Sequence, residues 1–233
     1  MDPIQRTVES FFYQLSNPEL LLTTLSIYFL PTLLAITLHE AAHGYVAQLL
    51  GDNTAQMLGR VSLNPLKHAD PKGTFLIPFL CYFLTAGQFV FGYAKPVPVN
   101  TRFLGNPKRD MGIVAFAGPA SNFLQALIWY AIFLITKINH LDLSQEICWA
   151  GVLTNLSLMA LNLFPLPPLD GGRIAISLLP IKLANLIAKV ESKGFYILIA
   201  LWFLGIIKLW ILLLTLTSFD LIQLLTSSLN NLQ

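Results

Sequence analysis

The chain has 233 residues, of which 55% are hydrophobic and only 11% are charged, and its mean hydropathy is positive. Soluble domains carry roughly 25% charged residues, so the composition excludes an ordinary soluble domain and predicts an integral membrane protein. The formal net charge of +2 is too small to indicate nucleic-acid binding. We therefore expect the protein to lie in the lipid bilayer and to bind no nucleic acid.

Three apolar stretches approach or exceed the roughly 20 residues that cross a bilayer. They cover residues 20–50, 111–136 and 147–164. A moderately apolar helix over 174–193 is expected to lie on the membrane surface or to be partly inserted. The apolar stretch 195–228 is expected to cross once or twice. The sequence predicts an all-α, polytopic helical bundle of about five or six membrane segments, folded as a single domain over residues 1–233.

The sequence His39-Glu40-Ala41-Ala42-His43 lies in the first apolar stretch. Its two imidazoles share one face of a helix and can hold a zinc ion. Glu40 is not expected to bind the metal, but it is placed to take a proton from an activated water. The alternative is a set of polar contacts between helices. We favour the metal site because ionisable groups inside a membrane are costly and usually functional.

A catalytic zinc site needs a third protein ligand and one open position. Asp170 is the candidate, because it follows the proline-broken end of the 147–164 span and precedes two glycines. The alternative role for Asp170 is an N-cap of the next helix. His68 and His140 are the competing ligands, and both are expected to be surface histidines.

Two amide side chains, Asn122 and Asn162, lie within or at the edge of apolar spans, close to prolines. Such an amide can donate a hydrogen bond to a developing oxyanion or hold an extended peptide. The alternative is a hydrogen bond between neighbouring helices, and for either residue taken alone the pattern favours this alternative.

Three motifs together resemble the site-2 protease family of intramembrane zinc metalloproteases. They are His39-Glu40-Ala41-Ala42-His43, Gly118-Pro119-Ala120-Ser121-Asn122 and residues 162–171, and the likeness covers residues 20–180. Residues 92–100 look like the short bacterial branch without a PDZ domain, although that branch often has Trp at the position of Tyr93.

The resemblance implies one zinc ion per chain, bound by His39, His43 and Asp170, with Glu40 as general base. It also implies that Asn122 and Asn162 bind substrate or stabilise the intermediate. The expected activity is hydrolysis of a peptide bond in or near a transmembrane segment of a membrane-protein substrate.

The alternative is a non-catalytic zinc-binding membrane protein or transporter. A transporter would carry polar residues along more of its length, and a structural zinc would favour four protein ligands without an adjacent base. A zinc hydrolase acting on a lipid is a third possibility. The motifs alone leave it open, whereas the resemblance favours a peptide substrate.

The site residues must meet at one membrane depth, which predicts that residues 73–94 enter and leave by the same face as a re-entrant segment. Its prolines and glycines agree with broken backbone at membrane depth. The active-site side then carries eleven Lys and Arg, from Arg60 to Lys193, against Arg6 and Lys137 on the other side. By the positive-inside rule, the active site is expected to face the cytoplasm, in a bacterial inner membrane. A single crossing by 73–94 would give a weaker split of nine against four.

Overall fold

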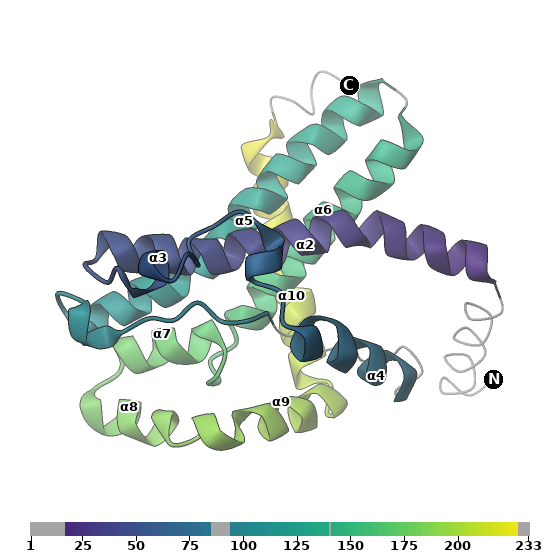
Figure 1. Cartoon of the computed structure of the whole chain (residues 1–233). Coiled ribbons are helices and arrows are strands. Elements are labelled where there is room, and N and C mark those ends of the chain that lie inside the picture. Colours follow the sequence, from purple (N-terminus) through teal and green to yellow (C-terminus); the bar gives the residue numbers. More distant parts are fainter. Residues whose placement is uncertain (1–16, 85–93, 140, 228–233) are drawn as a thin grey trace.

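The protein is helical in a computed structural model, which describes residues 17–84, 94–139 and 141–227 (Figure 1). No β-strand occurs in these ranges, and the predicted all-α fold is confirmed. The α-helices are α2 (Pro18–Leu49), α3 (Thr54–Met57), α4 (Ile77–Leu84), α5 (Pro107–Ile138), α6 (Asp142–Asn162), α7 (Asp170–Leu178), α8 (Ile181–Ala188), α9 (Gly194–Phe203) and α10 (Ile206–Leu225). Short 3-10 turns lie at Pro65–Lys67, Thr101–Phe103 and Glu191–Lys193, and a π-helical turn lies at Pro71–Leu76.

Three helices of the described chain are long and apolar enough to cross a membrane. They are the Leu22–Leu49 part of α2, the whole of α5 and the whole of α10. Pro31 lies within α2 and does not end it. Helix α6 has 21 residues and covers the third predicted span, but it is not one of these three helices. Its crossing of the membrane, like the total of five or six membrane segments, stays a prediction.

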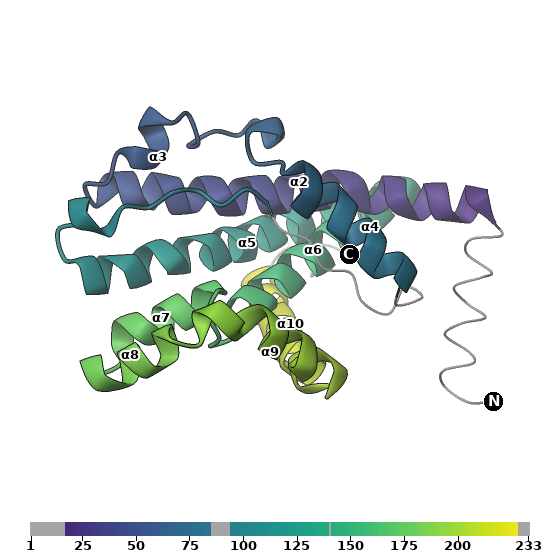
Figure 2. The same ribbon diagram turned by 60° about the horizontal axis from the view of Figure 1, so that its bottom comes forward.

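Helix α5 lies at the centre of the bundle, packed against α2, α6 and α7 (Figures 1 and 2). It runs antiparallel to α2, because Asn122 contacts Ala35 whereas Val114, earlier in α5, contacts His43 later in α2. The second half of α5 and residues 152–159 of α6 meet one buried residue of α10 in an apolar cluster: Ala126, Tyr130, Leu134, Val152, Leu156, Met159 and Ile222. This cluster anchors the half of α5 that lies away from the site.

The described part of the predicted re-entrant segment is the end of the Pro71–Leu76 turn followed by α4. Residues 71–84 span at most about 21 Å as a helix, less than the roughly 30 Å of the hydrocarbon core. They are therefore too short to cross the membrane. Residues 85–93 lie outside the described ranges, so the return of the segment to the same face stays a prediction.

The apolar stretch near the C-terminus is two helices and not one. Gly205 separates α9 from α10 with a φ of +79°, a left-handed conformation that glycine adopts readily. At ten residues, α9 is only about 15 Å long, so α10 is the one part of this stretch that can cross. The predicted surface helix over 174–193 is likewise divided, into α7 and α8, at Pro180.

Candidate active site

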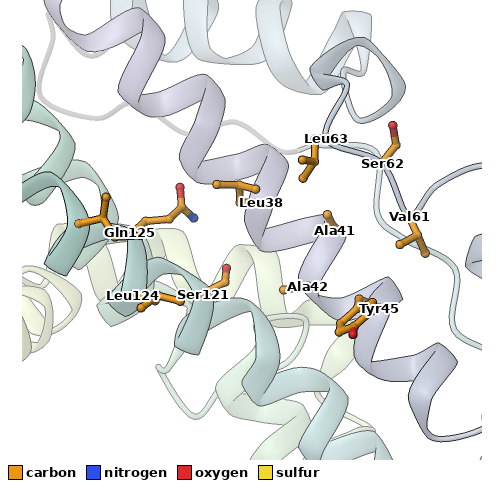
Figure 3. Close-up of a pocket in the computed structure, with 11 residues that line it drawn as sticks. Leu38, Ala41, Ala42, Tyr45, Val61, Ser62, Leu63, Ser121, Leu124 and Gln125 are labelled. Atoms are coloured by element: carbon orange, nitrogen blue, oxygen red, sulfur yellow. The ribbon is translucent and has the colours of Figure 1, made fainter.

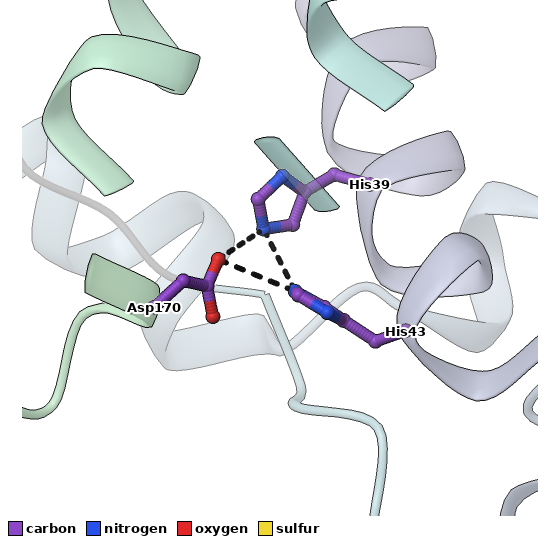
Figure 4. Close-up of side chains that lie close together, drawn as sticks. All are labelled: His39, His43 and Asp170. Carbon is purple, nitrogen blue, oxygen red and sulfur yellow. Dashed lines mark hydrogen bonds and ion pairs between the residues drawn. The ribbon is translucent and has the colours of Figure 1, made fainter. Parts of the chain in front are cut away.

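His39, His43 and Asp170 come together at one buried point between α2, α5 and α7 (Figure 4). The Nε2 atom of His39 lies 3.1 Å from Oδ2 of Asp170, and that of His43 lies 3.4 Å from the same oxygen. The two Nε2 atoms are 3.1 Å apart. Ligands bound tetrahedrally to zinc at about 2.0–2.1 Å lie about 3.3 Å from one another, so the three atoms have the spacing that such an ion requires.

The approach of these side chains depends on glycines. A Cβ atom on Gly118 of α5 would lie 2.5 Å from ring atoms of both His39 and His43, so only glycine leaves room for the two rings. A Cβ on Gly171 or Gly172 would lie 2.2–2.4 Å from backbone atoms of residues 163–167. The glycines after Asp170 therefore let the start of α7 pack tightly against the preceding loop, which brings the carboxylate to the histidines.

Asp170 is not an N-cap. It is the first residue of α7, the N-cap position is occupied by Leu169, and no side-chain cap hydrogen bond is made there. Its Oδ2 atom is buried without a hydrogen-bond donor of its own. The side chain is thus directed to the two histidines.

The hydrogen bonds on the far side of each ring determine which ring nitrogen is protonated. His43 donates from Nδ1 to the carbonyl of Val114 at 2.7 Å, and His39 donates from Nδ1 to Oδ1 of Asn122 at 2.6 Å. Neutral imidazoles then present the lone pairs of Nε2 toward Oδ2 of Asp170. Three acceptor atoms converge with no proton between them, an arrangement that a cation stabilises and that matches the ligand set of a catalytic zinc site.

Glu40 lies beside an extended stretch of the chain. Its Oε2 atom accepts a hydrogen bond from the backbone N–H of Val97 at 3.0 Å. Arg60 holds the beginning of the same stretch, donating to the carbonyl of Lys95 at 2.7 Å and also to that of Lys67. These contacts fix residues 94–97 next to the carboxylate expected to act as base.

The other end of this stretch is held by Asp52, which is fully buried. Its Oδ2 atom accepts from the backbone N–H of Asn100 at 2.6 Å, and its Oδ1 atom accepts from the N–H and hydroxyl of Thr54. Burial raises the pKa of the Asp52 carboxyl, but the hydrogen bonds from Thr54 and Asn100 outweigh it and hold the pKa below its ordinary value. The sequence did not indicate a role for Arg60 or Asp52, because each forms hydrogen bonds with backbone groups that are distant in the sequence.

The structure separates the two predicted amides. Asn122 is fully buried and contacts His39 directly. Asn162 is half-buried and donates to the carbonyl of Leu158 in its own helix at 3.0 Å, with no hydrogen bond to the His39–His43–Asp170 group. The sequence analysis did not single out Asn155, although its amide inside an apolar span was a signal of the same kind. In the structure Asn155 is fully buried and accepts a hydrogen bond from Asn122.

The competing histidines do not join the metal group. The expectation that His68 is a surface residue is wrong: it is 1% exposed, and its Nε2 atom bonds to the carbonyl of Ser62 within its own loop. The loop between α3 and α4, which carries His68, packs against α2. His140 lies outside the described residues.

A separate pocket of about 430 Å³ lies between α2, α5 and the loop after α3 (Figure 3). It is lined by Leu38, Ala41, Ala42, Tyr45, Val61, Ser62, Leu63, Ser121, Leu124, Gln125 and Ile128. Gln125 is buried, and its amide has no hydrogen-bond partner in the described part of the chain. None of the metal group lines this pocket, so it is distinct from the site.

The sequence of the chain is similar to those of known proteins. The sequence profile of peptidase family M50 matches residues 136–205. YwhC of Bacillus subtilis is 38% identical over 208 residues, which cover 85% of this chain and 88% of that protein. Rip2 of Mycolicibacterium smegmatis is 28% identical over 193 residues, covering 81% of this chain and 71% of that protein. Both relatives are named as inferred zinc metalloproteases. No solved structure matches.

The likeness to YwhC extends over most of both chains, and the His39–His43–Asp170 group that converges in the structure could hold a metal ion. These findings favour an enzyme over the non-catalytic alternative. The chain belongs to peptidase family M50, the site-2 protease family, and is a membrane-embedded zinc metalloendopeptidase.

Proposed function

We propose that this protein hydrolyses a peptide bond in or near a transmembrane segment of a membrane-protein substrate. One observation carries the proposal: the buried His39–His43–Asp170 group is built on α2, a helix apolar enough to span the bilayer. In this proposal the group holds one zinc ion and Glu40 is the general base. Residues 1–233 act as one protease domain, with a catalytic core over about 20–180 and a membrane segment within 195–228.

A zinc ion bound there supplies electrophilic activation of a water molecule and of the substrate carbonyl. The Glu40 carboxylate takes the proton of the attacking water and delivers it to the leaving amide nitrogen. The hydrogen bond from Val97 holds one carboxylate oxygen, Oε2, and leaves Oε1 to carry the proton. Hence the orientation of the base depends on the extended stretch beside it.

The substrate must be unwound at the cleavage point, since a helix hides its carbonyls in internal hydrogen bonds. Asn162 is half-buried and is the amide we propose for contact with substrate or with the developing oxyanion. All hydrogen-bonding groups of Asn122 are directed to other parts of the protein, so for Asn122 we favour a role within the protein.

We also propose that the site faces the cytoplasm of a bacterial inner membrane. Arg60 and Lys95 belong to loops, and Lys108 lies in the first turn of α5, whereas Lys137 lies in the last turn of α5, at the opposite end of that helix. This distribution follows the positive-inside rule. Cysteines placed at Lys67, Lys108 and Asp142, with Cys81 and Cys148 replaced, test it with a membrane-impermeant maleimide. Labelling of Asp142→Cys from outside with protection of the other two is expected; the reverse pattern would reject the orientation.

The function is tested with purified protein in liposomes that hold a candidate membrane-protein substrate. Glu40→Gln is expected to bind zinc as the wild type does and to lose cleavage by at least about 1,000-fold, the scale of a general base combined with water activation. Glu191→Gln changes an exposed glutamate and should cleave normally. Glu40→Gln also serves as the trap for isolating uncleaved substrates from cells. Normal cleavage by Glu40→Gln would reject the proposed mechanism.

A further inference from the structure

We propose that Asn155 and Asn122 are positioning residues, which together fix the protonation and orientation of the zinc ligand His39. The inference rests on the metal site proposed above. Asn155 accepts from Nδ2 of Asn122 at 2.9 Å, and Oδ1 of Asn122 accepts from Nδ1 of His39 at 2.6 Å. The three side chains come from α6, α5 and α2, and the two amides are fully buried.

Two backbone carbonyls lock the direction of this chain of hydrogen bonds. Nδ2 of Asn155 donates to the carbonyl of Gly151 at 2.9 Å, so its Oδ1 faces Asn122. Nδ2 of Asn122 donates both to Asn155 and to the carbonyl of Ala35 at 3.2 Å, so its Oδ1 faces His39. Because a carbonyl can only accept, neither amide can flip without leaving buried polar groups unpaired. Nδ1 of His39 must then carry the proton, and Nε2 keeps its lone pair for the metal.

The comparison with His43 shows why side chains are needed here. The Nδ1 atom of His43 is held by the Val114 carbonyl, which is part of the α5 backbone and cannot rotate. The partner of Nδ1 in His39 is the side-chain amide of Asn122, which can rotate, so the backbone alone does not determine whether its oxygen or its nitrogen faces the ring. Asn155 supplies that direction for Asn122, and groups that orient a metal-bound histidine are typically worth about 10- to 100-fold in metal affinity.

An ordinary hydrogen bond between helices would hold α5 to α6 without affecting the metal. Zinc affinity, measured in detergent by competition with a chelator on monodisperse protein, distinguishes the two roles. Asn155→Leu is expected to weaken zinc binding about 10- to 100-fold. Asn155→Asp should bind zinc within about threefold of the wild type, because a neutral buried carboxyl group offers the same acceptor and donor.

A double variant tests whether Asn155 acts through Asn122. If it does, Asn122→Leu with Asn155→Leu should bind zinc no more weakly than Asn122→Leu alone, since coupled residues are not additive. Gln125→Leu is the matched control: this buried amide of α5 is outside the chain of hydrogen bonds and lines the pocket of Figure 3. Its zinc affinity should be unchanged.

Several outcomes would overturn the inference. They are wild-type zinc affinity in folded Asn155→Leu, additive losses in the double variant, or an equal loss in Gln125→Leu. If Asn155→Leu does not fold, failure of Asn155→Asp to retain affinity is decisive. His39→Ala separates this inference from the metal site itself: if His39→Ala keeps its zinc, the proposed site is wrong, and if it loses zinc while Asn155→Leu does not, only the positioning role is wrong.

Discussion

The two halves of α5 pack in different ways. Its first half carries Gly112, Gly118 and Asn122, and the side chains of α2 and α7 approach it so closely that a Cβ on Gly112 would lie 2.1 Å from the Ser177 hydroxyl. Its second half carries large residues, Tyr130 and Leu134, which pack with α6 and α10. The same helix is therefore a close-contact surface at the active site and an apolar anchor away from it.

The difference shows how polar chemistry is kept inside an apolar bundle. Lipid is as apolar as leucine, so membrane helices associate through close packing and hydrogen bonds. The first half of α5 uses close packing and hydrogen bonding. Its small residues leave room for the two imidazole rings, and Asn122 accepts a hydrogen bond from the ring of His39. The second half relies on the volume of its side chains and is expected to determine stability without determining metal binding.

The largest effect is expected from Gly118→Ala. The added methyl group would lie 2.5 Å from the rings of His39 and His43, and the rings can move only by giving up the hydrogen bonds to Asn122 and Val114. We expect zinc affinity to fall by more than about 100-fold, measured by chelator competition. Gly105→Ala is the control, because a Cβ there lies 3.5 Å from its nearest neighbour. Wild-type zinc binding by Gly118→Ala would show that the site does not depend on close contact.

Leu134→Ala tests the second half of α5. This residue is buried in the apolar cluster, and its truncation should lower the free energy of unfolding by about 2–5 kcal/mol. Zinc affinity of the folded protein should not change. Leu212→Ala, at a residue of α10 that is 54% exposed, is expected to shift stability by less than about 0.5 kcal/mol. Thermal unfolding in detergent gives both values, and a loss of zinc affinity in Leu134→Ala would contradict the division between the halves.

A smaller effect is expected from Arg60→Ala, which frees the stretch beside Glu40 at its beginning. The expected result is a loss of about 10-fold in kcat/KM, of the size seen when a group that orients catalytic residues is removed. Zinc affinity should stay constant because Arg60 contacts none of the three proposed ligands. Arg102→Ala is the control, because it removes an exposed arginine whose side chain makes no hydrogen bond within the described residues. Equal activity of the two variants would show that Arg60 does not help to orient the stretch beside Glu40.

The smallest effect concerns Asp52 and depends on pH. The folded-state pKa of Asp52 lies below the ordinary value of 3.8, so its ionised form stabilises the fold above pH 3.8 and this contribution is lost as the pH falls through the lower folded-state pKa. Asp52→Asn should therefore unfold at a lower temperature than the wild type at pH 7, and the difference should shrink below pH 3.8. A difference that stays constant down to the lowest pH would show that ionisation of Asp52 is not responsible.

The sequence alone determined the features that depend on local pattern. Length and apolar composition predict the helices that became α2, α5 and α6. The four-residue spacing of His39 and His43 places both rings on one helix face whatever surrounds them. Asp170 could be chosen from the sequence as the candidate third ligand because few other acidic groups lie at the ends of apolar spans. The resemblance to a known family pointed to the same residue.

Only the tertiary structure decided which groups hold these residues in place. Asn122 lies 83 residues from His39 in sequence, and Val97 lies 57 residues from Glu40. An amide in an apolar span predicts a polar partner but not which one, since the partner depends on how helices cross. The burial of His68 has the same origin, because it depends on how the loop that carries it packs against the rest of the protein. Local periodicity determined that His39 and His43 share a helix face, and packing between distant helices determined which groups hold these two proposed ligands in place.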